Sequence, residues 1–84
     1  MNPEVISVAA LSNARLRLRF ANGEVRVFDA SPYIGRGIFQ RLRDPDLFAR
    51  ARVVAGCVEW PSGLDLSNDT LYLDSIPDEQ HDAA

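Results

Sequence analysis

Few residues of this chain have side chains suited to nucleophilic or metal chemistry. The sequence has a single cysteine, Cys57, and a single histidine, His81. A thiol needs a nearby base such as an imidazole to act as a nucleophile, and a Cys/His metal site needs more ligands than one of each. Cys57 lies inside a predicted strand and His81 lies in a polar C-terminal segment, so we do not expect them to meet. We interpret Cys57 as a small buried strand residue.

Two other segments carry polar residues that could suggest a site. Asp65, Asn68 and Asp69 do not have the spacing of a calcium loop, and no acid stands at its closing position, so helix capping is the better interpretation. Ser62 lies in a Pro-Ser-Gly turn and lacks the G-x-S-x-G surroundings of a catalytic serine. We therefore expect no enzymatic activity, no metal and no cofactor.

The segment RLRLRFANGEVRVFD, residues 15–29, predicts the central hairpin of the fold. Its polar and apolar residues alternate, and Asn22-Gly23 is a strong signal for a two-residue hairpin loop. That loop would place Leu18 opposite Val27. The apolar face of the hairpin would then consist of Leu18, Phe20, Val25 and Val27.

The opposite face of the hairpin is the candidate binding surface. In the same register it consists of Arg15, Arg17, Arg19, Arg26 and Phe28. A flat basic surface with an aromatic is typical of sheets that stack single-stranded nucleic acid, and it also suits an acidic protein. A solvated outer face without a ligand is the third interpretation. The net charge of −3 argues against nucleic acid.

Charge is distributed unevenly along the chain. Residues 1–52 hold all nine arginines and five of the twelve acids, whereas residues 53–84 hold seven acids and no arginine. This asymmetry indicates either a basic face that seeks an acidic partner or two halves that neutralise each other in the fold.

The remaining elements are expected to build a sheet with helices on one side. A strand over residues 4–10 precedes the hairpin, and short helices near Pro32, Phe39 and Pro45 follow it, the last capped by Asp44. A second hairpin turns at Ala55-Gly56 and pairs Arg52 with Glu59. Ser67 or Asn68 caps a closing helical turn.

These elements predict an α+β fold: a small antiparallel sheet, made of two β-hairpins plus an N-terminal strand, with short helices packed on one face. One compact domain is expected over residues 1–76, followed by a disordered acidic tail over residues 77–84. No segment approaches the roughly 20 apolar residues of a membrane helix. One cysteine and no secretory leader indicate a cytoplasmic protein.

A set of motifs resembles a known family of small bacterial proteins, the domain of unknown function 2442 (DUF2442) family. The most specific is W-P-x-G-x-D-L. The matching residues are Phe20, Asn22, Gly23, Glu24, Phe28 and Asp29, then Gly37, Phe39 and Leu42, then Trp60, Pro61, Gly63, Asp65 and Leu66, and finally Leu71 and Tyr72. The resemblance covers about residues 3–73.

The W-P-x-G-x-D-L block also has a structural reading. We expect Trp60 to pack in the core, Pro61 and Gly63 to shape a turn, and Asp65 to accept hydrogen bonds from nearby backbone N–H groups. Together with Asn22 and Gly23, these residues form the predicted turn and core motif.

The resemblance implies a compact α+β domain with no established activity. Family members are often encoded beside another short protein, in an arrangement suggestive of a toxin–antitoxin pair, and some carry a helix-turn-helix domain after the shared region. The chain ends about ten residues beyond Leu71-Tyr72, so we expect no such domain here. We expect a non-catalytic protein-interaction module whose partner is a protein encoded nearby or a second copy. The alternative is an accessory single-stranded nucleic-acid binder, and no membrane partner is expected.

Overall fold

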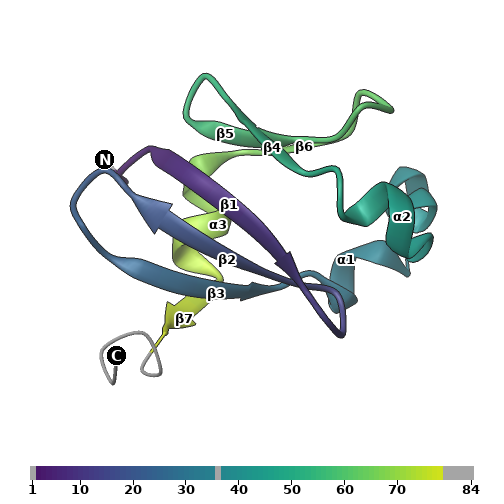
Figure 1. Ribbon diagram of the computed structural model, residues 1–84, viewed down its shortest axis with the longest axis horizontal. Coiled ribbons are helices and arrows are strands. Elements are labelled where there is room, and N and C mark those ends of the chain that lie inside the picture. The colour runs from purple at the N-terminus through teal and green to yellow at the C-terminus, as the bar shows by residue number, and fades with distance from the viewer. Residues whose placement is uncertain (1, 36, 79–84) are drawn as a thin grey trace.

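A computed structural model describes residues 2–35 and 37–78 of the chain. It contains two antiparallel sheets and short helices (Figure 1). The four-stranded sheet has the order β1 (Val5–Leu11), β2 (Arg15–Phe20), β3 (Val25–Asp29) and β7 (Ser75–Pro77). The three-stranded sheet has the order β4 (Arg52–Val54), β5 (Cys57–Glu59) and β6 (Asp65–Leu66). The helices are α1 (Ser31–Ile34), the 3-10 helix η1 (Gly37–Arg43), α2 (Pro45–Phe48) and α3 (Asn68–Leu73).

The predicted α+β class is confirmed, with two differences in detail. The two predicted hairpins belong to separate sheets, since β2 and β3 lie in the four-stranded sheet and β4 and β5 in the three-stranded one. The strands β6 and β7 were not expected from the sequence. The strand β6 adds a third strand to the β4–β5 hairpin, which would be marginal on its own, and β7 adds a fourth strand to β1, β2 and β3.

The central hairpin forms in a register one residue away from the predicted one. Its loop has three residues, because the Phe20 N–H donates to the Glu24 carbonyl at 2.9 Å and the Gly23 N–H donates to the Phe20 carbonyl at 2.9 Å. Gly23 has φ of +92°, whereas Asn22 is not among the positive-φ residues. A type I turn followed by a left-handed glycine is the usual three-residue hairpin loop.

This one-residue shift turns every side chain of β3 to the opposite face. Leu18 lies opposite Arg26, and Val27 lies opposite Arg17, so the predicted pairing of Leu18 with Val27 is wrong. Phe28 is completely buried opposite Leu16. The observed register buries this large aromatic ring and leaves two valines half-exposed, which removes more apolar area from water than the predicted register would.

The second hairpin forms as predicted. Arg52 pairs with Glu59, and their side chains are joined by an ion pair of 3.2 Å. The two-residue loop Ala55-Gly56 has φ of +51° and +81°, as a type I′ turn requires. Alanine is therefore held in a left-handed conformation that favours glycine or asparagine.

The W-P-x-G-x-D-L block forms a third hairpin turn, between β5 and β6. The Trp60 N–H donates to the Leu64 carbonyl at 2.8 Å, and the Gly63 N–H donates to the Trp60 carbonyl at 2.9 Å. Gly63 has φ of +91°. Asp65 starts β6 opposite Glu59, and its side chain makes no hydrogen bond within the described part of the chain, so its predicted bonding to backbone N–H groups is wrong.

Short polar side chains begin the helices largely as expected. The Asp44 carboxylate accepts from the Asp46 N–H ahead of α2, and the Ser67 hydroxyl accepts from the Thr70 N–H ahead of α3. At α1 the arrangement differs. Ala30 is the N-cap residue, and the Asp29 carboxylate accepts from the Ser31 N–H at 2.9 Å.

The core lies between the inner face of the four-stranded sheet, the three-stranded sheet and the helices. Trp60 is completely buried, its indole N–H donates to the Phe48 carbonyl at 3.0 Å, and its ring stacks on that of Phe48 at 6.0 Å between centroids. The prediction that Trp60 is a core residue is confirmed. The largest fully buried side chains are those of Trp60, Phe20, Phe28, Leu16, Leu18, Leu71, Val5 and Val58.

The start of the predicted tail is part of the fold. Pro77 ends β7, opposite Arg26, and the Asp78 N–H donates to the Val25 carbonyl at 2.9 Å. The Asp78 side chain is only 6% exposed and pairs with Arg17. Disorder is therefore the wrong prediction for Pro77 and Asp78, and the rest of the predicted tail, residues 79–84, lies outside the described residues.

Candidate functional site

The outer face of the four-stranded sheet is the surface that the arginine pattern predicted. Arg15, Arg17 and Arg19 project from β2 on this face, and all three are exposed. Their neighbours on β3 are Asp29, Val27 and Val25, and their neighbours on β1 are Leu11, Ala9 and Ser7. The surface thus mixes guanidinium groups with small and aliphatic side chains. Ile76, opposite Val27 on β7, adds an aliphatic side chain that is 67% exposed.

The three arginines of this face have different surroundings. The Arg17 Nε lies 2.7 Å from the Asp78 carboxylate. The Arg15 Nε donates to the Ser12 carbonyl at 3.3 Å. Arg19 makes no ion pair and no hydrogen bond of its side chain with any described residue. Of the three, Arg19 is therefore the guanidinium most available to a ligand.

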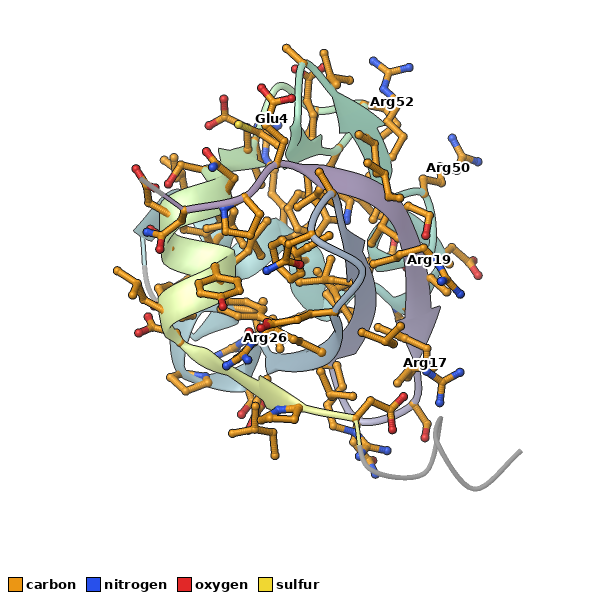
Figure 2. The ribbon with its side chains drawn as sticks, turned by 90° about the vertical axis from the view of Figure 1, so that its left-hand side faces the viewer. Glu4, Arg17, Arg19, Arg26, Arg50 and Arg52 are labelled. Carbon is orange, nitrogen blue, oxygen red and sulfur yellow. The ribbon has the colours of Figure 1, made fainter. Side chains whose placement is uncertain are left out.

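Two residues of the predicted surface do not lie on it. Arg26 and Phe28 lie on the inner face of the sheet, because the observed register turns β3 over. In Figure 2 the labelled Arg26 lies beside α3, well apart from Arg17 and Arg19. The predicted combination of four arginines with one aromatic is therefore wrong. Within residues 2–35 and 37–78, the outer face has no phenylalanine on which a base could stack.

Arg26 instead joins α3 and β7 to the sheet. Its guanidinium contacts the Ser75 hydroxyl and carbonyl at 2.7 Å each, and the Glu24 carboxylate at 3.2 Å. It also lies over the Tyr72 ring, 4.7 Å from the centroid. The Tyr72 hydroxyl contacts the same Glu24 carboxylate at 3.1 Å, which closes the cluster. An arginine as little exposed as Arg26 needs such partners for its donors.

The sequence offered only a weak signal for this cluster. Arg26 and Glu24 are two apart on one strand, which places them on the same face. Their contact with Tyr72 and Ser75 depends on how α3 packs, and that is set by long-range contacts that alternation along a strand does not reveal. The cluster has a structural role and leaves little of Arg26 exposed.

The other chemically suggestive residues remain separate. The Cys57 thiol is half-buried, and its hydrogen-bond partner in the described chain is the Asn68 side-chain oxygen at 4.0 Å. The Ser62 hydroxyl oxygen is buried and makes no hydrogen bond to a described residue. Within residues 2–35 and 37–78 no three His, Cys, Asp or Glu side chains gather as a metal site would require. His81 lies outside these residues.

Two shifted pKa values mark polar contacts at the ends of elements. Hydrogen bonds from the Ser31 backbone N–H and hydroxyl, helped by the nearby charge of Arg15, lower the pKa of Asp29 below its ordinary value of 3.8. Accepting from the Tyr33 hydroxyl, the Asp74 carboxylate raises the pKa of Tyr33 above its ordinary value of 10.0. The Asp29 contact therefore stabilises the start of α1, and the Asp74 contact joins α1 to the end of α3.

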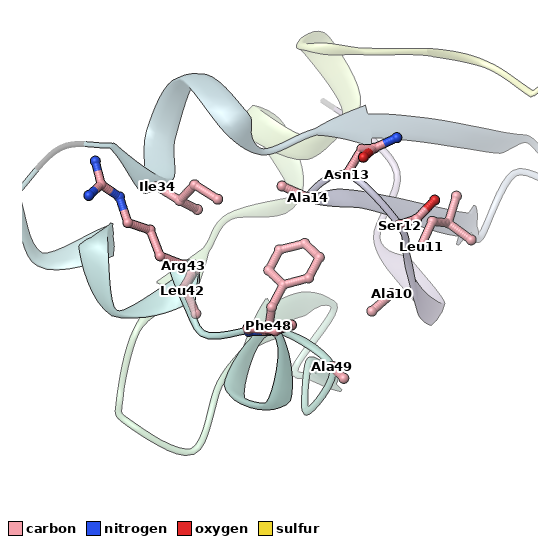
Figure 3. A pocket seen from close by; sticks show the side chains of 11 residues that line it. Ala10, Leu11, Ser12, Asn13, Ala14, Ile34, Leu42, Arg43, Phe48 and Ala49 are labelled. Atoms are coloured by element: carbon pink, nitrogen blue, oxygen red, sulfur yellow. The ribbon is translucent and has the colours of Figure 1, made fainter.

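A small cavity lies at one end of the four-stranded sheet, between the β1–β2 turn and the helices η1 and α2 (Figure 3). Its volume is about 230 Å³, and the Phe48 ring forms one wall. Ala14, Ile34 and Leu42 surround that ring, while the Arg43 side chain extends away from it (Figure 3). The polar residues of the lining, Ser12, Asn13 and Arg43, do not converge on one point as groups that orient a reacting substrate do.

Comparison with known protein families decides what the chain is related to. The model of the family described as "Protein of unknown function (DUF2442)" matches residues 5–77. The chain belongs to the DUF2442 family. The matched range runs from the first residue of β1 to the last residue of β7, so the DUF2442 unit includes both sheets and every helix of the described fold. No curated protein and no solved structure is significantly similar to it.

The DUF2442 fold has no membrane-spanning helix among its described residues, because none of their helices is both long and apolar enough to cross a bilayer. The family name attaches no activity to the fold.

Proposed function

We propose that this DUF2442 protein is a small, non-catalytic protein-interaction module that acts in the cytoplasm. The observation that carries the proposal is the composition of the outer sheet face. Exposed or half-exposed Val25, Val27 and Ile76 stand beside the exposed Arg15 and Arg19. Arginine is enriched at protein interfaces, and aliphatic side chains supply the apolar area that such interfaces bury.

The partner we propose is a second small protein encoded nearby, in the manner of a toxin–antitoxin pair. The DUF2442 resemblance supports this choice. The lack of a catalytic set among the described residues supports the non-catalytic part of the proposal, because the described polar partner of the one thiol is an amide and not a base.

The alternative function, single-stranded nucleic-acid binding, has less support. Sheets that bind single strands combine basic side chains with aromatic rings on the same face. Here Phe28 is buried and Arg26 is held by Glu24 and Ser75. Among the described residues, the outer face keeps three arginines of the predicted surface, one of which is paired with Asp78.

Co-expression of the chain with the protein encoded next to it, followed by affinity purification, tests the proposal. We expect a complex of defined stoichiometry that survives size-exclusion chromatography. A Val27→Glu variant should weaken the complex, because it adds a charge to the centre of the outer face. Asp46→Asn, at the exposed start of α2, is the control. Recovery of the chain alone under these conditions would contradict the proposal.

A further inference from the structure

The two edges of the four-stranded sheet differ sharply. On one side the edge strand β7 has three residues, includes Pro77, and lies between Asp74 and Asp78. Short length, proline and neighbouring charges are the devices by which proteins keep sheet edges from pairing with other chains. The edge strand on the other side, β1, has seven residues, VISVAAL, with no charge and no proline. Only β7 is protected in this way.

The backbone of β1 is free along most of its outer side. At its start the Val5 N–H donates to the Gly56 carbonyl at 2.9 Å, and the preceding carbonyl, that of Glu4, accepts from the Ala21 N–H at 2.8 Å. From Ile6 to Leu11, β1 pairs with β2 alone among the described residues. The strand β4 packs near β1 but belongs to the other sheet. Unpaired N–H and C=O groups therefore line β1 beyond Val5.

Arginines flank this free edge. Arg52, Arg50, Arg19 and Arg17 lie along the same side of the molecule as β1 (Figure 2). On β1, the residues opposite Arg19 and Arg17 are Ser7 and Ala9, both small and exposed. Strands of a sheet lie about 4.8 Å apart, so an arginine side chain can extend over a serine or alanine to reach a strand added beyond them.

We propose that the β1 edge binds an acidic, extended segment of a partner protein by strand addition. Backbone hydrogen bonds to Ile6–Leu11 supply the pairing, and carboxylates on alternate residues of the segment meet the guanidinium groups that flank β1. Arg19 and Arg50 carry most of this interaction, since both are exposed and neither forms an ion pair with a described residue. The proposal rests on the proposed function, and it names the partner's chemistry.

The chain itself contains a contact of the proposed kind, between a carboxylate next to an edge strand and an arginine of β2. At the other edge, β7 adds to β3 and the carboxylate that directly follows it, Asp78, reaches Arg17 across the sheet at 2.7 Å. The arginines of β2 therefore already accept a carboxylate that follows an edge strand of this sheet.

A second copy of this chain fits the β1 edge less well than an acidic segment. Pairing of β1 with β1 would place Arg17 and Arg19 of both copies on one surface, where like charges oppose association, whereas an acidic segment brings the complementary charge. Single-stranded nucleic acid cannot pair with the backbone of β1, and the adjoining outer face has no aromatic ring in the described residues for its bases.

A fluorescent, end-capped peptide of about eight residues with alternating Glu and Val tests the proposal on the full chain. We expect binding that weakens as salt rises, and slower hydrogen exchange of amides between Ile6 and Leu11 in the complex. The matched peptide of alternating Lys and Val should bind at least about tenfold more weakly. Equal binding of both peptides, or unchanged exchange along β1, would overturn the proposal.

Two pairs of variants locate the site. Ala9→Glu keeps the fold, because its carboxylate lies opposite Arg17, but it repels the acidic peptide, whereas Ala9→Gln is the neutral control of equal size. Arg19→Gln should weaken binding by at least about fivefold, and Arg41→Gln, on η1, should leave it unchanged. Tighter binding of a single-stranded uridine oligonucleotide, or dimerisation abolished by Ala9→Glu, would also overturn the proposal.

The proposed function and this inference fail in different ways. A complex with the neighbouring protein that is unaffected by Ala9→Glu, with β1 amides unprotected, would overturn strand addition and leave the interaction module standing. Peptide binding at β1 without any complex with the neighbouring protein would overturn the proposed function and leave strand addition at β1 standing.

Discussion

Phe20 and Trp60 hold equivalent positions in two turns of the same geometry. Each residue donates its N–H to the carbonyl four residues later and accepts at its own carbonyl from a glycine three residues later, at 2.8–2.9 Å in all. Both aromatic side chains are completely buried. Each turn therefore starts from a side chain anchored in the core, and each ends with a glycine near φ of +90°.

The glycine of the first turn should be intolerant of substitution for backbone reasons alone. A Cβ on Gly23 would meet no atom within 4 Å, but φ is +92°. We expect Gly23→Val to destabilise the protein by about 1–2 kcal/mol, because a β-branched residue is strained there. The denaturation midpoint in urea measures the loss. Gly35→Ala is the matched control: Gly35 has φ of −84°, and its Cβ would lie 3.8 Å from Arg43, so the midpoint should change little.

In the turn of the second hairpin, one residue has a strained backbone conformation that a substitution can relieve. Ala55 has φ of +51° in the turn between β4 and β5, directly before Gly56 at +81°. We expect Ala55→Asn to raise the free energy of unfolding by about 0.5–1 kcal/mol, because Asn-Gly is the preferred type I′ pair. Thermal unfolding followed by circular dichroism checks the sign. Ala49→Gly, in the right-handed region at φ of −67°, should lower stability instead.

How far the sequence predicts this fold is clearest at these two hairpins. For Ala55-Gly56 the short loop and the Arg52–Glu59 pair were enough to fix the register. For Asn22-Gly23 the local signal favoured a two-residue loop, and the burial of Phe28 favoured the neighbouring register. The second effect is tertiary, so it is invisible in the turn itself.

The candidate surface was likewise predicted correctly where local alternation decided it, and wrongly where the strand register decided it. Alternation in RLRLRF was enough to place Arg15, Arg17 and Arg19 on one exposed face. The positions of Arg26 and Phe28 depended on the register, and the prediction for them was wrong. The strand β7 could not be predicted, because its three residues pair with a distant strand and carry no alternation of their own.

Trp60 should be one of the most costly residues to truncate. Its side chain is fully buried, stacks on Phe48 and donates to that residue's carbonyl. We expect Trp60→Ala to destabilise by about 3–5 kcal/mol, because it leaves a cavity and removes the indole hydrogen bond to the Phe48 carbonyl. Trp60→Phe keeps most of the ring and should cost clearly less. A Trp60→Ala protein with an unchanged melting temperature would contradict the core assignment.

Asp29 should contribute to the fall of folding stability at low pH. Hydrogen bonds from Ser31 lower its pKa below the ordinary 3.8 in the folded state. A depressed folded pKa gives stability that is present above the unfolded pKa and is lost as pH falls through the folded one. Urea midpoints measured between about pH 5 and about pH 2 should therefore fall less in Asp29→Asn than in the unmodified chain. An equal fall of the midpoint in Asp29→Asn and in the unmodified chain would contradict this role of Asp29.

A comparison of Arg26 with Arg19 distinguishes a residue needed for stability from one available for binding. Its side chain is 16% exposed and has contacts to Ser75, Glu24 and the Tyr72 ring, whereas Arg19 is exposed and makes no ion pair with a described residue. We expect Arg26→Gln to destabilise by about 2 kcal/mol, because it leaves Glu24 without its cation and Ser75 with weaker contacts. Arg19→Gln should change stability by less than about 0.5 kcal/mol.

Urea denaturation of the two variants, alongside binding of the acidic peptide, completes the comparison. Arg26→Gln should unfold at lower urea yet, where folded, bind the peptide as the unmodified chain does. Arg19→Gln should show the reverse pattern, with unchanged stability and weaker binding. Tyr72→Phe removes only the hydroxyl bond to Glu24 and keeps the ring beneath Arg26, so it should cost about 1 kcal/mol. If Arg26→Gln kept full stability but lost peptide binding, the guanidinium would be a ligand contact after all, and the assignment of Arg26 to the structural cluster would be wrong.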